Sequence, residues 1–223
     1  MQPLRIDWTF TTPLVSSSDY LQHLDALVAF AVCDEARALG AHDAVELSKD
    51  LSHVFARASG PSGGEVWKAS ALVFTPSSEV FTTTMVRRTD PLAYIEAQDR
   101  GLLHGRVRTA LDPNRGADRN YFIHHSYQWM ERASAWCIAD EDELRAALAR
   151  IPAIGKMTRN GFGRIKDMQI TTDDEAHDKW KLRVLPPGLD GSMGVTYVPA
   201  QLCLQPPYWD KTGQTRAMEP VIG

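Results

Sequence analysis

The stretch from Gly155 to Ile165, GKMTRNGFGRI, combines residue types that suit a nucleic-acid backbone and contains no acid. Its glycines have no β-carbon, so they permit positive φ angles and let another backbone approach the main-chain amides. Phe162 offers a ring face on which an unstacked base can lie. Positive charge comes from four residues in or just after the stretch: Lys156, Arg159, Arg164 and Lys166. We predict a loop that binds a phosphate backbone together with an unstacked base.

Other glycine-containing nucleotide loops do not fit this stretch. It lacks the GxxxxGK[ST] pattern of a Walker loop and the GxGxxG pattern of a dinucleotide-binding fold. The sequence leaves one alternative open, which is a flexible surface loop whose cations are only solvated.

The chain as a whole does not have the charge typical of a nucleic-acid-binding protein. Its 223 residues carry a net charge of −4. Between Asp19 and Asp50, however, seven acids are balanced only by Arg37 and Lys49, so this window holds −5 and the rest of the chain sums to +1. Such asymmetry allows a basic face to exist beside an acidic one.

Composition indicates a globular protein of the cytoplasm. The chain is 43% hydrophobic but has no apolar run of about 18 residues, so we expect no membrane span. Its N-terminus lacks the apolar segment of a secretory signal. Cys33, Cys137 and Cys203 are odd in number and far apart, which argues against a disulfide framework or a structural zinc site.

The elements that must position the loop follow from the hydrophobic pattern. Leu4, Ile6 and Trp8 alternate with polar residues, as in a half-buried strand, and Asp140 with Glu143 forms a capping-box pattern at a helix start. The predicted strands cover residues 3–15, 66–75, 79–86, 127–139 and 164–172, and the predicted helices cover about 19–38 and 140–151. This order predicts an α+β, ferredoxin-like (RRM-like) fold with the glycine-rich loop after its second helix.

An arginine-rich insertion over about 87–125 interrupts this order. Residues 87–120 look irregular and carry seven arginines against five acids. The segment is too long for a simple connection, so we expect a functional insertion. We predict one domain over 1–223, with a proline-rich C-terminal extension over about 185–223 that wraps around it.

Four motifs in this order resemble the RAMP superfamily of CRISPR-associated RNA-binding proteins. TPLVSSSDYLQHLDALVAFA is similar to the first strand and helix of those proteins, VWKASALVF to a core strand, and IGKMTRNGFGRI to their glycine-rich loop. The C-terminal LRVLPPG and QPPYW resemble the subunit of type IV CRISPR complexes that belongs to the "Cas five" group. The likeness is scattered over about residues 3–210 and does not extend to the insertion.

The resemblance implies a subunit of an antiviral effector complex. Similar proteins cap one end of a filament of repeated RAMP backbone subunits, grip the 5′ handle of the guide RNA (crRNA) and adjoin the large subunit. The expected partners are therefore guide RNA, those two subunits, the double-stranded DNA flanking the target, and a helicase recruited to the complex. Base pairing with the guide supplies sequence specificity, while protein reads a short flanking motif.

The resemblance also implies which residues touch nucleic acid. The RNA-binding set of the loop is Lys156, Arg159, Gly161, Phe162, Gly163 and Arg164. Trp67 and Lys68 are weaker candidates on a strand, and a core position for Trp67 is the alternative. A clamp over RNA or DNA would use Arg87, Arg88, Arg106, Arg108, Arg115 and Arg119, with a solvated surface held by local ion pairs as its alternative.

We predict that the protein is not an enzyme and needs no metal or cofactor. Some RAMP relatives cut guide precursors without metal, using histidine as acid and base. Here the histidines considered are His23, His104, His124 and His125, and none has a diagnostic partner in sequence. A metal-independent endoribonuclease remains the alternative, and a ferredoxin-like interaction module without nucleic acid is a third hypothesis.

Overall fold

The computed structural model describes residues 1–15, 21–61, 63–102, 112, 114–115 and 119–222. The chain divides into two compact units, the first formed by Met1–Glu79 with Gln128–Gly223 and the second by Val80–Tyr127. Each unit is described by itself.

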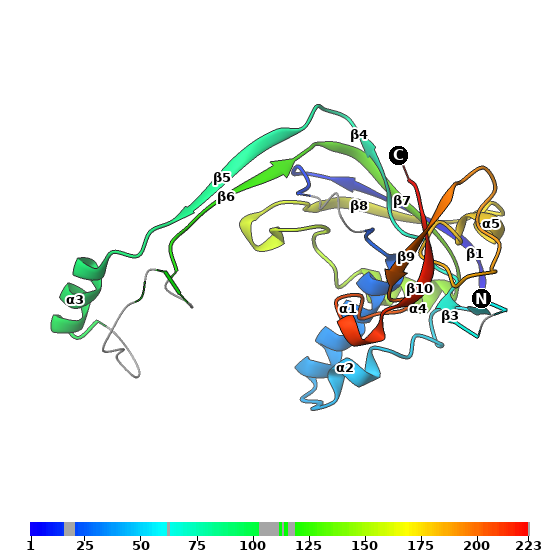
Figure 1. The fold of residues 1–223 in the computed structure, drawn as a ribbon, viewed down its shortest axis with the longest axis horizontal. Coiled ribbons are helices and arrows are strands. Elements are labelled where there is room, and N and C mark those ends of the chain that lie inside the picture. The colour runs from blue at the N-terminus through cyan, green and yellow to red at the C-terminus, as the bar shows by residue number, and fades with distance from the viewer. Residues whose placement is uncertain (16–20, 62, 103–111, 113, 116–118, 223) are drawn as a thin grey trace. The chain divides into compact units, whose positions relative to one another are not determined.

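The first unit is built on a four-stranded antiparallel sheet (Figure 1). Its strands are β1 (Gln2–Phe10), β4 (Val73–Pro76), β7 (Met130–Ala139) and β8 (Ile165–Thr172), in the order β4-β7-β1-β8. Each neighbouring pair is antiparallel, and the register places Ile6 opposite Ala135 on one side and Ile170 on the other. The predicted combination of helices with an antiparallel sheet is confirmed.

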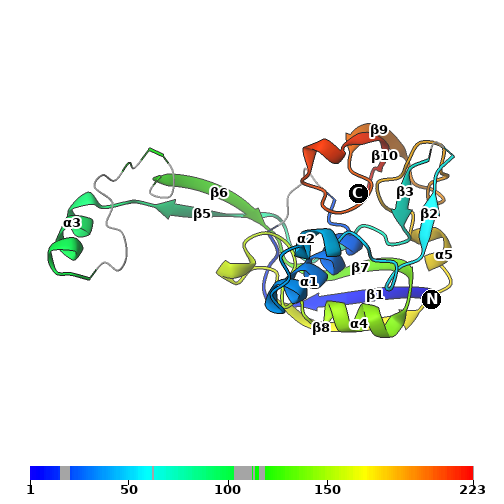
Figure 2. The same cartoon turned by 90° about the horizontal axis from the view of Figure 1, so that it is seen from below.

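Alternation along β1 determines which face of the sheet is buried. Leu4, Ile6 and Trp8 are at most 1% exposed and belong to the main core, as the sequence pattern predicted. On the same face lie α1 (Leu24–Ala38) and α4 (Glu141–Leu148), which Figure 2 shows side by side against the sheet. The core therefore fills the layer between these two helices and the sheet.

Helix α4 begins as the sequence predicted. The side chain of Asp140 accepts hydrogen bonds from the amides of Asp142 and Glu143 at 3.1 and 3.2 Å. The amide of Asp140 itself is bonded to the carbonyl of Val54 at 2.9 Å, so the reciprocal bond of a capping box is not needed there.

Helix α1 begins later than the predicted start near residue 19. Before Leu24 the backbone is held extended, because His23 forms a β-bridge with Ala71 and the carbonyl of Gln22 accepts from the amide of Leu72. From Leu24 onward the prediction of a helix is confirmed.

The predicted strand over 66–75 is two strands. Its first part is β3 (Glu65–Trp67), which pairs with β2 (Arg57–Ser59), and its second part is β4 in the main sheet. Hydrogen bonds from the side chain of Arg183 to the carbonyls of Trp67 and Ala69 hold the chain between β3 and β4 in place. A short helix, α2 (Ala44–Leu47), lies in the region that the sequence left undefined.

The C-terminal part adds a second small sheet. Strands β9 (Tyr197–Leu202) and β10 (Thr215–Pro220) form an antiparallel pair, with the short helix η3 (Lys211–Gly213) between them and α5 (Ala176–Lys179) before them. The prediction of an extension that only wraps the domain missed this hairpin.

The second unit is a long hairpin with a helix. Strands β5 (Phe81–Arg87) and β6 (Tyr121–Tyr127) pair over their whole length, and α3 (Pro91–Asp99) follows β5. Asp90 caps α3 by accepting from the amides of Leu92 and Ala93. The prediction of irregular structure over 87–120 is therefore wrong for α3, whose Asp-Pro start is a recognised helix signal.

A fully buried arginine joins distant parts of the first unit. Arg183 donates to a carboxylate oxygen of Asp25 on α1 at 3.0 Å and to the hydroxyl of Tyr208 at 2.7 Å. It also donates to the main-chain carbonyls of Trp67 at the end of β3, of Ala69 between β3 and β4, and of Leu204 in the C-terminal part. Tyr208 in turn donates to Asp25 at 2.9 Å, so Arg183, Asp25 and Tyr208 each have a hydrogen-bond partner among the other two.

Burial controls the ionisation of this cluster. It raises the pKa of the Asp25 carboxyl and that of the Tyr208 hydroxyl. Burial opposes the charge of Arg183, but the neighbouring Asp25 carboxylate raises the pKa of the guanidinium instead. Burial, followed by the nearby charge of Arg183, lowers the pKa of His23, whose ring stacks on Tyr208 with 4.3 Å between centroids. His23 is therefore a neutral imidazole at pH 7.

Replacing Arg183 by Met should destabilise the protein strongly. Because the Asp25 carboxylate would stay buried without its partner, we expect Arg183→Met to lower the free energy of unfolding by about 3–5 kcal/mol in urea denaturation. The control is Arg145→Ala, which breaks the exposed pair with Glu141 and should cost less than about 1 kcal/mol.

A double variant tests the cause of that loss. If the unpaired buried charge is responsible, adding Asp25→Asn to Arg183→Met should recover part of the lost stability. Equal stability of Arg183→Met and Arg145→Ala would contradict the role given to this cluster.

Candidate nucleic-acid interface

The glycine-rich loop is anchored at both ends. It follows α4 and Pro152, and its two sides meet in a β-bridge between Ala153 and Arg164. A second bridge joins Lys156 to Val15, which lies in the segment that follows β1. The amide of Gly163 donates to the carbonyl of Pro13 at 2.8 Å. The loop is thus fixed to the segment after β1 rather than free in solvent.

Two of its glycines are required by close packing. A β-carbon on Gly163 would lie 1.8 Å from the carbonyl oxygen of Ile154, and one on Gly155 would lie 3.0 Å from that of Val15. Both residues also have positive φ angles. Gly161 differs, because its φ is +91° but nothing lies within 4 Å of the position of its β-carbon. Only Gly161 therefore has space in front of it for another backbone.

The main-chain amides at the end of the loop are already bonded within the protein. The amides of Gly161, Phe162 and Gly163 donate to the carbonyls of Thr158, Met157 and Pro13, and the amide of Arg164 donates to the hydroxyl of Thr12. The prediction that glycine exposes amides for phosphate is not supported at these positions. Phosphate binding by this loop would depend on side chains.

The cationic side chains of the loop are exposed. Lys156, Arg159, Arg164 and Lys166 all face solvent. Within the part of the chain that the structure describes, none of them lies within ion-pair distance of a carboxylate. Phe162 is half-buried between them. The loop and the start of β8 can therefore present four positive charges and part of one aromatic ring to an anionic strand.

The structure places Trp67 away from solvent. Its side chain is 1% exposed and belongs to the main core, with the guanidinium of Arg57 4.4 Å from the ring centroid. The core position that the sequence left as the alternative is the one observed, so no ring face of Trp67 is open to a base. Lys68 is half-buried, with its ammonium 5.7 Å from the ring centroid of Trp180.

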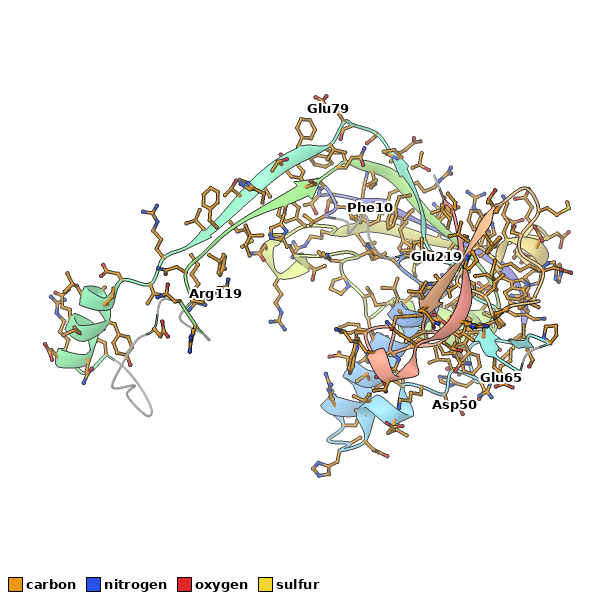
Figure 3. All side chains as sticks on the ribbon, in the orientation of Figure 1. Phe10, Asp50, Glu65, Glu79, Arg119 and Glu219 are labelled. Atoms are coloured by element: carbon orange, nitrogen blue, oxygen red, sulfur yellow. The ribbon has the colours of Figure 1, made fainter. Side chains whose placement is uncertain are left out.

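The arginines proposed as a clamp lie in the second unit where they can be described. Arg87, Arg88, Arg115 and Arg119 are exposed, and Figure 3 labels Arg119 just before β6. Arg106 and Arg108 lie outside the described residues. No carboxylate of the described residues forms an ion pair with the four exposed arginines, so the alternative of local ion pairs gains no support for them.

The histidines considered for catalysis occupy different settings. His23 is buried, as described above. In β6, Nδ1 of His124 lies 3.0 Å from the hydroxyl oxygen of Thr84, and the neighbouring His125 points to the other face of the strand. His104 lies outside the described residues. Across the described residues, no group of three or more acidic, histidine or cysteine side chains is arranged to hold a metal ion.

Sequence reasoning missed the buried cluster of His23, Asp25, Arg183 and Tyr208. A signal was present, because Asp25 interrupts the apolar run HLDALVAFA and Arg183 stands inside LRVLPP. Charged residues at apolar positions are rarely buried unless they are paired. What the sequence could not show is that these two would pair across 158 positions.

Comparison with known proteins assigns the chain to a class, that of CRISPR type IV associated proteins. A family model matches residues 2–220, which is nearly the whole chain, and the chain belongs to that family. The family is the CRISPR type IV associated protein Csf3. No curated protein sequence matches the chain. None of the described helices is long and apolar enough to cross a membrane.

The family assignment confirms the type IV CRISPR association that the sequence motifs implied. It makes the chain a subunit associated with type IV CRISPR systems. The finer placement in the RAMP superfamily and its "Cas five" group stays a prediction.

Gly161 and Gly163 allow a matched test of the loop geometry. Gly161→Ala adds a β-carbon in open space and should cost only the strain of a left-handed alanine, about 1–2 kcal/mol. Gly163→Ala adds the same strain plus a collision with the carbonyl of Ile154, so its melting temperature should fall further, by about 5 °C or more. Equal melting temperatures of the two variants in calorimetry would contradict this geometry.

Proposed function

We propose that this chain is the non-catalytic guide-RNA-binding subunit of a type IV CRISPR ribonucleoprotein, and that its glycine-rich loop contacts the 5′ handle of the guide. The observation that supports this best is a set of exposed cations that form no ion pair with any described residue: Lys156, Arg159 and Arg164 on the anchored loop, and Lys166 at the start of β8. Single-stranded RNA is bound mainly by such charges together with stacking on aromatic rings. Phe162 and the open space at Gly161 support contact with a base and with the backbone.

The fold that we propose for the first unit is ferredoxin-like, of the RAMP type. Taken in chain order, the core elements are β1, α1, β4, β7, α4 and β8. The strand order β4-β7-β1-β8, with both helices on one face, supports this topology. We also propose that the chain acts as one domain in which residues of about 87–125 are an insertion, and that it works in the cytoplasm.

The position proposed in the complex is one end of the backbone filament. There the subunit would contact a RAMP backbone subunit and the large subunit, lie near the double-stranded flank of the target DNA and come close to a recruited helicase. The second unit supports protein contacts because it exposes several large apolar side chains: Val86, Leu92, Ile95, Phe122 and Ile123. Its exposed arginines supply the proposed clamp on RNA or DNA.

Removing two loop cations should weaken RNA binding and reduce its salt dependence. For Arg159→Ala with Arg164→Ala, we expect the dissociation constant for handle RNA to rise at least tenfold at low salt. Because each lost phosphate contact on a single strand reduces the slope of log K against log salt by about 0.7, the slope should decrease by about 1.4. Filter binding at several salt concentrations measures both quantities.

A matched pair of arginines on the helices provides the control. Arg37→Ala with Arg145→Ala removes the same charge from exposed positions on α1 and α4. This control should keep the wild-type slope. If both double variants bind RNA alike, the loop is not the RNA site.

The absence of catalysis is tested separately. We expect the purified protein to leave repeat RNA intact during incubation in a chelator, because metal-independent cleavage needs a paired acid and base. Discrete cleavage products that disappear in His124→Ala would instead identify the endoribonuclease of the alternative hypothesis.

A further inference from the structure

The first unit contains a cavity of about 490 Å³ between the start of α1 and the C-terminal hairpin. A volume of this size is typical of small-molecule sites. Its apolar lining includes Val184 and Leu202. Its other walls are aromatic and polar side chains: His23, Tyr208, Trp209, Lys211, Gln214 and Glu219. The cavity shares no residue with the glycine-rich loop.

One wall of the cavity is rigid. His23 and Tyr208 are stacked, and the hydroxyl of Tyr208 is held by Asp25 and Arg183. The Nδ1 atom of His23 is buried and has no hydrogen-bond partner among the described residues.

Other residues that line the cavity have side chains that the fold does not hold in place. Trp209 is 78% exposed although it lines the cavity. Within the described residues, the side chains of Lys211, Gln214 and Glu219 make no hydrogen bond or ion pair. Glu219 lies on β10, where Figure 3 labels it. The cavity is thus lined by an exposed tryptophan, an ammonium, an amide and a carboxylate, and the last three have no hydrogen-bond or ion-pair partner among the described residues.

We propose that this cavity binds a nucleobase. Trp209 provides the stacking face, because base–aromatic stacking does not depend on which base is present. Glu219 accepts hydrogen bonds only, so it favours bases that carry an exocyclic amine over uracil, whose one Watson–Crick donor, N3–H, lies between two carbonyl oxygens that repel a carboxylate. Lys211 and Gln214 donate to ring acceptors or to the attached phosphate. The inference is independent of the proposed loop site.

Titration of the full-length protein with nucleotides tests the proposal. In calorimetry, AMP, GMP and CMP should bind more tightly than UMP, and ribose 5-phosphate and indole should bind much more weakly than any of the four. Equally tight binding of ribose 5-phosphate would show a phosphate site, and equally tight binding of indole would show a merely apolar cavity. Either result overturns the proposal.

Variants connect binding to named side chains. Trp209→Ala should weaken nucleotide binding about tenfold or more, because it removes a stacked ring. Trp129→Ala, which removes a tryptophan that is 43% exposed and lies outside the cavity, should leave it unchanged. Glu219→Gln should remove the preference for amine-bearing bases over UMP. Equal effects of Trp209→Ala and Trp129→Ala would overturn the assignment of the cavity.

A second arm distinguishes a free nucleotide from a base within an RNA strand. A single-stranded RNA with a photoreactive base is cross-linked to the full chain, and the linked peptide is identified. Cross-linking at Tyr208 or Trp209 without binding of mononucleotides assigns the cavity to an RNA base, whereas mononucleotide binding without this cross-link assigns it to a free nucleotide. The absence of both the cross-link and mononucleotide binding would overturn the proposal.

The loop variant separates this proposal from the proposed function. Arg159→Ala with Arg164→Ala should bind mononucleotides as the wild type does, since these residues do not line the cavity. Loss of nucleotide binding in this double variant would mean that the nucleotides occupy the loop and would overturn the cavity assignment.

Discussion

The buried guanidinium of Arg183 connects three stretches of the first unit that are far apart in the chain. It donates hydrogen bonds to Asp25 on α1, to the carbonyls at the end of β3 and just after it, and to Tyr208 and Leu204 in the C-terminal part. A buried charge is tolerated only when its donors are satisfied, so these partners must keep fixed positions. Three features of the fold lie around this one side chain: the break between β3 and β4, the late start of α1 and the packing of the C-terminal part. The cavity wall formed by His23 and Tyr208 depends on it too.

In the glycine-rich loop too, contacts with a distant segment fix the backbone. Gly155 and Gly163 let the chain pass close to Val15 and Ile154, and the resulting hydrogen bonds use the amides at the end of the loop. Because these hydrogen bonds anchor the loop, Arg159 and Arg164 extend from a fixed backbone. Gly155 and Gly163 therefore serve mainly to allow close packing. Because the loop is anchored, less conformational entropy is lost when its cationic side chains bind a ligand.

Part of this arrangement could be predicted from the sequence. Three features depend only on residues that are neighbours in the sequence: the alternation in β1, the Asp140 cap of α4 and the position of the loop. Such local patterns can be recognised without knowing the contacts between distant segments. Trp67 and Arg183 could not be placed, because burial of the first and pairing of the second are set by contacts between distant segments. Helix α3 was missed although Asp90 and Pro91 mark its start, because none of its residues is buried and it therefore lacks the apolar face by which a helix is recognised in sequence. The free amides expected in the loop were lost to hydrogen bonds with residues 12 and 13, which no local pattern reveals.

We propose that guide RNA lies on the exposed cations of the anchored loop. The most direct measurement is a cryo-electron microscopy structure of the assembled type IV complex with its guide. We expect handle phosphates within hydrogen-bonding distance of the Arg159 and Arg164 side chains. An ordered guide elsewhere on the subunit, with these two arginines facing solvent or another protein, would contradict it.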